Sequence, residues 1–221
     1  KEFSPRAGLI YKPKDNISGY YSYSESFLPR SGEQFKSLSA SSAALDPDVY
    51  ESSEVGVKVT ISDDLSLTAA FFESEQTVAS KDDVTGEDKD IKGLTVDGFE
   101  AELKGNLTDK FSLVAGFTAI NGETSSGGEP REIPDQMLTL FGTYEISDKA
   151  GVAFGFTKQG ESNIKNNKPD LVLPSYTRFD MAAYYNISDD LVLRFNLENL
   201  TDELYFPHSH STHQVLSLIH I

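Results

Sequence analysis

Cysteine and tryptophan are both absent from this sequence of 221 residues, and only two methionines are present. Without cysteine, the chain has no disulfide framework, no thiol nucleophile and no thiolate metal site. Long hydrophobic runs are also missing, and a membrane-spanning helix needs roughly 20 consecutive apolar residues. Any segment of this chain that crosses a membrane must therefore be a β-strand.

Basic residues are scarce relative to acidic ones. The chain has 19 Lys and Arg residues against 35 Asp and Glu residues, which gives a net charge of −16. A protein that binds nucleic acid needs a basic surface to contact phosphates, so we expect no nucleic-acid partner. Residues 1–5 lack the basic start and apolar segment of a signal peptide, and the chain does not begin with Met. We therefore expect a fragment of a longer protein.

The clearest positive feature is a period-two alternation of apolar and polar residues. It occurs, for example, in residues 54–61, 94–106 and 191–199, and it is typical of β-strands with two different faces. Ten Tyr and fourteen Phe fit half-exposed sheet surfaces. The pattern predicts ten strands. They cover residues 3–12, 17–27, 50–61, 65–78, 94–106, 111–124, 135–146, 151–160, 175–187 and 191–200.

The lengths of the strands and their connections indicate a membrane barrel. Most predicted strands have about 10 to 14 residues, enough for a tilted strand to cross a bilayer and more than the roughly 5 to 6 common in globular proteins. Short turns alternate with long loops, as in outer-membrane barrels with short periplasmic turns and long extracellular loops. The short turns are 13–16, 62–64, 108–110, 147–150 and 188–190; the long loops are 28–49, 79–93, 125–134, 161–174 and a fifth from 201.

We therefore expect an all-β fold, an antiparallel up-and-down meander of about ten long strands that forms part of a transmembrane outer-membrane β-barrel. As a fragment it should be an open curved sheet, in which the first and tenth strands do not pair. Two alternatives use the same alternation. One is a free-standing outer-membrane barrel enzyme of about 10 or 12 strands, such as a protease or lipase. The other is a soluble acidic β-sandwich that binds a partner.

The alternation also predicts which side of each strand meets lipid, because a Lys or Arg in mid-membrane costs about 2 to 4 kcal/mol. The residues expected to face lipid are Phe99, Leu103, Phe179, Met181, Leu193, Phe195 and Leu197. The residues expected to face the lumen are Glu100, Arg178, Asp180, Arg194 and Glu198.

Several segments carry family-like motifs. They are FSPRAGLIYKP at 3–13 with YSYSESF at 21–27, YESSEVGVK at 50–58, VDGFE at 96–100, LPSYTRFD at 173–180 and NLENLTDELY at 196–205. Each motif alone is weak. Their order and spacing across residues 3–206 resemble the C-terminal part of the β-barrel of TonB-dependent siderophore receptors.

That resemblance implies a barrel of about 22 strands closed by an N-terminal plug domain, with this chain supplying the twelfth to the twenty-first strand. It implies TonB-energised uptake of a ferric siderophore across the outer membrane of a Gram-negative bacterium. The partners would be the ferric siderophore, TonB through the missing plug domain, and outer-membrane lipid. Residues 1–206 would be the partial barrel and 207–215 the start of the last extracellular loop. Residues 216–221 resemble the translation of a transposon end and are expected to be a non-native tail; a divergent final strand is the alternative.

Candidate ligand-binding residues lie on or beside the long loops. They are Phe27, Arg30, Phe35 and Arg131. Arginine and aromatic side chains suit an anionic, aromatic iron chelate through charge and stacking. In the parent receptor, the lumen-facing charges Arg178, Asp180, Arg194 and Glu198 would contact the plug or each other.

The sequence contains no convincing catalytic set. It has no G-x-S-x-G, no H-E-x-x-H and no glycine-rich phosphate loop, so we predict no catalytic residue and no cofactor. His208, His210 and His213 form an H-x-H-x-x-H pattern that suits a metal ion, but no carboxylate accompanies it closely. We therefore predict a solvated loop there and no metal site.

Overall fold

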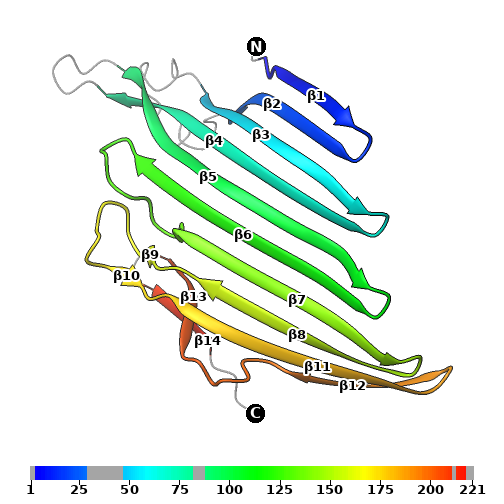
Figure 1. The fold of residues 1–221 in the computed structure, drawn as a ribbon. Coiled ribbons are helices and arrows are strands. Elements are labelled where there is room, and N and C mark those ends of the chain that lie inside the picture. Colours follow the sequence, from blue (N-terminus) through cyan, green and yellow to red (C-terminus); the bar gives the residue numbers. More distant parts are fainter. Residues whose placement is uncertain (1–2, 29–46, 82–87, 211–212, 218–221) are drawn as a thin grey trace.

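The computed structural model describes residues 3–28, 47–81, 88–210 and 213–217, with side chains described for 3–28, 47–78 and 91–208. Ten strands form one antiparallel sheet, and each pairs with its neighbour in chain order (Figure 1). They are β1 (Arg6–Lys14), β2 (Ile17–Leu28), β3 (Asp48–Ser62), β4 (Leu65–Lys81), β5 (Asp88–Thr108), β6 (Phe111–Thr124), β7 (Gln136–Ser147), β8 (Ala150–Gln159), β11 (Tyr176–Ser188) and β12 (Leu191–Leu197). The described residues include no helix that is long and apolar enough to span a membrane.

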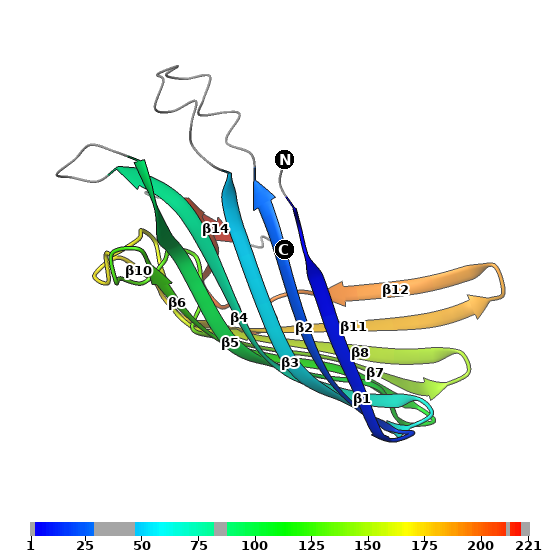
Figure 2. The same cartoon turned by 90° about the horizontal axis from the view of Figure 1, so that it is seen from above.

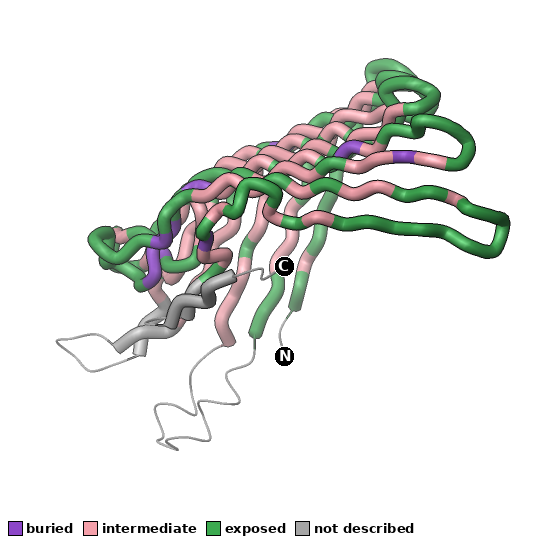
Figure 3. The backbone as a smooth tube through the Cα atoms, turned by 90° about the horizontal axis from the view of Figure 1, so that it is seen from below, coloured by how far each residue is buried: buried purple, intermediate pink, exposed green. Residues whose placement is uncertain are grey.

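The sheet is open and curved. β1 and β12 are the two edges of the strand order and do not pair with each other. Figure 2 shows that the strands between them follow a curve. Every residue of β1 and nearly all of β12 are exposed, as the colours in Figure 3 show. The predicted meander of ten long strands, open between its first and tenth strand, is confirmed.

Strand register separates the side chains into two faces. One row runs across five strands through Leu9, Tyr21, Val55, Phe71 and Phe99, each directly opposite the next. The rings of Phe71 and Phe99 lie 4.9 Å apart, and Phe71 is 63% exposed. Large apolar side chains this exposed across neighbouring strands fit a surface that meets hydrocarbon rather than water.

The opposite face is more polar. Directly behind the apolar row lies the row Tyr20, Gly56, Ala70 and Glu100. All seven residues that we expected to face lipid share the Phe71 face, whereas Glu100, Arg178, Asp180 and Arg194 share the Glu100 face. The predicted division of the strands into two faces is therefore confirmed; Glu198 lies one residue beyond β12, where no ladder fixes its side.

The short turns gather at one end of the sheet (Figure 1). The hydroxyl of Thr108 accepts the backbone N–H of Phe111 at 3.1 Å, and that of Ser147 accepts the N–H of Lys149 at 3.3 Å. Gly105 precedes one of these turns with a φ of +138°, and an added Cβ there would lie 1.7 Å from the carbonyl oxygen of Asp64. Glycine is therefore required where β5 passes the neighbouring turn.

Four short strands were not predicted. β9 (Ser162–Asn163) pairs with β10 (Val172–Leu173), and β13 (Tyr205–His210) pairs with β14 (His213–Ser217). The two-residue strands are too short to show alternation. The predicted strand 191–200 ends at Leu197, because Asn199 adopts a left-handed backbone with a φ of 52°.

Candidate functional site

Arg178 and Asp180 form an ion pair on the polar face of β11. Asp180 Oδ2 accepts hydrogen bonds from Arg178 Nε at 3.1 Å and from Arg178 Nη2 at 2.9 Å. The two residues are two positions apart on one strand, so the alternation of side chains puts both on the same face. Asp180 Oδ1 remains available and accepts the backbone N–H of Asn199 at 2.9 Å. One carboxylate thus holds both its neighbour on β11 and the turn that follows β12.

The turn after β12 is closed by the side chain of Asn199. Asn199 Oδ1 accepts the backbone N–H of Glu203 at 2.9 Å, and Asn199 Nδ2 donates to the carbonyl oxygen of Glu203 at 3.0 Å. The N–H of Leu200 donates to the carbonyl oxygen of Phe179 at 2.7 Å, which ties the turn to β11 a second time. Asparagine tolerates the left-handed backbone that this turn needs.

Tyr205 completes the arrangement. Arg178 Nη1 donates to Tyr205 Oη at 3.0 Å, and Arg178 Cζ lies 5.8 Å from the centre of the Tyr205 ring. The rings of Tyr176 and Tyr205 lie 4.7 Å apart, and Tyr205 is 4% exposed. The chain after β12 is therefore folded across the polar face of the sheet, and Figure 2 shows the β13–β14 hairpin within its curve. We call Arg178, Asp180, Asn199 and Tyr205 the Asp180 clamp.

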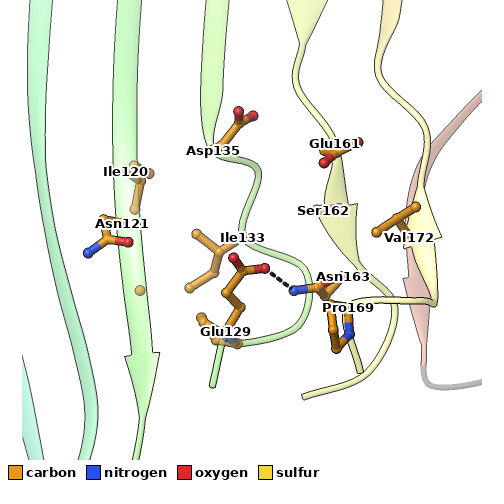
Figure 4. Close-up of a pocket in the computed structure, with 12 residues that line it drawn as sticks. Ile120, Asn121, Glu129, Ile133, Asp135, Glu161, Ser162, Asn163, Pro169 and Val172 are labelled. Carbon is orange, nitrogen blue, oxygen red and sulfur yellow. Dashed lines mark hydrogen bonds between the residues drawn. The ribbon is translucent and has the colours of Figure 1, made fainter. Parts of the chain in front are cut away.

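A cavity of about 320 Å³ lies among the loops at the end of the sheet away from the short turns. Figure 4 shows residues that line it. The cavity is bounded by the end of β6, the β6–β7 loop and the β8–β11 loop. Its polar lining is Asn121, Glu129, Asp135, Glu161, Ser162 and Asn163, and its apolar lining is Ile120, Pro130, Ile133, Pro169 and Val172. Three carboxylates line this space, and a wall of that charge favours cationic groups over anionic ones.

The predicted ligand residues do not come together in the described structure. Arg131 lies in the β6–β7 loop with an exposed side chain, and it is outside the lining of the cavity. Phe27 shares the face of Tyr21 on β2, which is the lipid-side face, so its position gives no support to a ligand contact. Arg30 and Phe35 lie outside the described residues. The ligand roles of these four residues stay predictions.

The predicted lumen charges separate into two groups. Arg178 and Asp180 bind each other in the Asp180 clamp, and any contact of theirs with a plug domain stays a prediction. Arg194 lies on the same face of β12, opposite Tyr184, and its contact with a plug domain stays a prediction. Within the described residues, no three His, Cys, Asp or Glu side chains are grouped so that they could hold a metal ion. The side chains of His210 and His213 lie outside that description.

Carboxylates line the lipid-side face beyond the apolar row, towards the long loops. Glu25, Glu51 and Glu75 lie directly opposite one another on three neighbouring strands. Lys92 Nζ lies 2.5 Å from Glu75 Oε2, and this hydrogen bond raises the pKa of Lys92. Because such charges are costly in hydrocarbon, we infer that the row of Glu25, Glu51 and Glu75 lies outside the membrane. The outer boundary of the membrane would then fall between this row and the Phe71 row.

The β-barrel of TonB dependent receptor-like proteins matches this chain over residues 1–200 as a family model. This chain belongs to the TonB-dependent receptor family. A probable TonB-dependent siderophore receptor, PiuA of Acinetobacter baumannii, is 30% identical over 94% of this chain and 31% of its own length. The ferripyoverdine receptor of Pseudomonas aeruginosa is 28% identical over 92% of this chain and 27% of its own length.

Solved structures agree with the family. The siderophore receptor PiuA from Acinetobacter baumannii superposes with a TM-score of 0.81 at 28% identity, over 96% of this chain and 34% of that structure. The Pseudomonas aeruginosa ferripyoverdine receptor bound to ferripyoverdine superposes with a TM-score of 0.80 at 26% identity, over 98% and 31%. The chain thus spans about a third of the length of the relatives it matches.

Family and fold together decide between the alternatives. The chain is part of an outer-membrane barrel of a Gram-negative bacterium. The soluble β-sandwich is wrong, because the ten described long strands form one sheet and the other described sheets have two strands each. The free-standing barrel enzyme receives no support, because the matched family consists of receptors.

Proposed function

We propose that the protein containing this chain takes up a ferric siderophore through the outer membrane, with energy supplied by TonB. The observation that carries the proposal is the superposition of the whole open sheet on a receptor solved with ferripyoverdine bound. The two faces of the sheet support it, because one suits lipid and the other suits a polar lumen. The remaining strands and the plug domain would come from the rest of the protein.

In this function the chain forms part of the barrel wall and of its loops. The charges of the Asp180 clamp satisfy one another, so their work is to hold the chain after β12 against the lumen wall. The acidic cavity among the loops favours a ferric chelate that carries cationic groups over a strongly anionic one. We infer that this chain has no catalytic role.

The test uses the full-length receptor expressed in a Gram-negative strain that lacks its own siderophore receptors. Uptake of radiolabelled iron is measured with catecholate, hydroxamate and mixed-ligand siderophores of differing charge. We expect uptake of at least one chelate, and its loss in a matched strain without TonB. Failure of every chelate, or uptake that persists without TonB, would contradict the proposal.

A further inference from the structure

The β6–β7 loop and the β8–β11 loop are joined by an extensive set of hydrogen bonds. Asn163, at the start of the second loop, is 5% exposed and reaches the first loop through backbone and side chain. Its carbonyl oxygen accepts the N–H of Glu132 at 2.8 Å, and its Nδ2 donates to Glu129 Oε2 at 2.7 Å. Asn163 also forms a parallel bridge with Arg131. This end of the junction therefore has the character of a small sheet rather than of two separate loops.

Asn167 makes the other half of the junction. Its backbone is left-handed, with a φ of 57°, and its N–H donates to the carbonyl oxygen of Glu129 at 3.0 Å. Its Oδ1 accepts the hydroxyl of Thr124 at 2.7 Å, and its Nδ2 donates to the hydroxyl of Ser126 at 2.5 Å. One side chain on the second loop thus bonds to two residues of the turn that begins the first loop.

Apolar residues of these two loops are more buried than most side chains of the barrel wall. Ile164 is 8% exposed and Leu173 is 2% exposed, and Pro130 from the other loop is also buried. β10 lies against β13, so the chain that follows β12 joins the same group. Buried apolar contacts and paired backbone groups are the features of regions that resist local opening.

We propose that the β6–β7 and β8–β11 loops form a single rigid body and stay joined to each other during uptake. Asn167 is the positioning residue that joins them. Here the hydrogen bonds of one loop end on the other, so neither opens without breaking the bonds of both. The two loops would therefore move only as one body.

Hydrogen exchange of the purified full-length receptor tests the junction directly. Asn167→Gly keeps the left-handed backbone but removes both side-chain bonds, so amides of residues 124–132 should exchange about tenfold faster although the change lies on the other loop. Asn167→Asp keeps an acceptor for both hydroxyls and should remain near the wild type. Lys165→Ala, an exposed position on the same loop, is the matched control. Faster exchange confined to residues 162–173 would overturn the proposal.

A disulfide between the two loops tests whether they stay joined during transport. A Cβ added at Gly128 would lie 3.1 Å from Asn167 Cβ, slightly less than the roughly 3.5 to 4.5 Å of a disulfide. A small outward shift of the exposed turn would therefore allow a disulfide in a Gly128→Cys, Asn167→Cys double variant. We expect the oxidised double variant to take up the wild-type receptor's siderophore within about twofold of the rate of each single Cys variant. Uptake that falls on oxidation and recovers with dithiothreitol would overturn the proposal.

The uptake experiment with the crosslinked variant rests on the proposed function, and the hydrogen-exchange experiment does not. If the wild-type receptor takes up no siderophore, the proposed function fails while the exchange result still decides whether the loops are joined. If the wild type transports and only the crosslinked variant fails, the loops must separate during uptake. The proposal of a single rigid body is then wrong, and the proposed function stands.

Discussion

Asp180 Oδ1 accepts the backbone N–H of Asn199 at 2.9 Å, a contact between two residues that the chain separates by the whole of β12. The same carboxylate holds Arg178 through its other oxygen, and Arg178 in turn holds Tyr205. The direction of the chain after the last long strand is therefore set by one carboxylate on the strand before it. The charged residues of LPSYTRFD at 173–180 are thus bonded to the Asn and Tyr of NLENLTDELY at 196–205.

Replacing Asp180 should loosen the segment after β12. Hydrogen bonds to charged groups contribute about 1.5 to 3 kcal/mol, so Asp180→Ala should lower the free energy of unfolding by at least that amount, because Arg178 is left unpaired. Asp180→Asn keeps an acceptor for Asn199 and should cost less. Urea unfolding of the full-length receptor in detergent measures both.

Limited chymotrypsin digestion supplies a local readout of the same change. Tyr205 is buried in the wild type, so cleavage near residues 204–206 should become faster in the Asp180→Ala variant. Glu198→Ala, an exposed carboxylate in the same segment, is the matched control and should leave both measurements unchanged. Equal effects of the two alanine variants would show that the Asp180 clamp does not hold this segment.

Two glycines on the polar face should respond differently to alanine. At Gly56 an added Cβ would lie 2.5 Å from the Tyr20 ring, whereas at Gly98 it would lie 2.5 Å from the backbone carbonyl oxygen of Ala119. Overpacking costs about 1 to 3 kcal/mol, and we expect both variants to be destabilised by that amount. Only the Gly56 variant should be rescued, by Tyr20→Ala, because a side chain can be removed and a carbonyl group cannot.

A double-mutant cycle for each glycine gives the measurement. The coupling between Gly56→Ala and Tyr20→Ala should be large, and that between Gly98→Ala and Phe72→Ala should be small, although the Phe72 ring lies 2.7 Å from the same added Cβ. Equal couplings would contradict the assignment of the Gly98 clash to the backbone.

The strands and their faces were predictable because a membrane barrel imposes a local rule. Each strand of the sheet must alternate to satisfy lipid on one side and lumen on the other, and that alternation is readable at Phe99 and Glu100 without knowledge of any partner strand. The Asp180 clamp was only half predictable. Arg178 and Asp180 were placed on the lumen face, but the bond to Asn199 is non-local and leaves no periodic signal.

The joined loops were missed for a different reason. Their Asn, Gly and Ser residues have the composition of a solvated loop, and composition does not show that Asn163 and Asn167 bond to another segment. The available signal was backbone preference, because Asn is among the non-glycine residues that most readily adopt the left-handed conformation seen at Asn167 and Asn199. Asparagines between strands can therefore indicate turns with a left-handed residue, but they do not identify the segments to which their side chains bond.

Spin labels should separate the two faces of the sheet in the full-length receptor. Labels at Phe99, Phe179 and Phe195 share the lipid-side face and should be accessible to oxygen dissolved in the bilayer. Labels at Thr118 and Arg194 share the other face and should be accessible to a water-soluble nickel chelate. A mixture of the two behaviours within either set would contradict the register.

The outer boundary of the membrane gives the last prediction. Leu103 lies opposite Leu67 and Ala115 within the apolar band, so Leu103→Arg should lower the free energy of unfolding by about 2 to 4 kcal/mol in a bilayer. Glu51 lies beyond the Phe71 row between Glu25 and Glu75, and like charges directly opposite destabilise a sheet. Glu51→Arg should therefore be neutral or stabilising, although it introduces the same side chain on the same face. Urea unfolding in lipid vesicles compares the two variants, and a similar loss of stability in both would place the Glu51 row inside the hydrocarbon and move the boundary towards the loops.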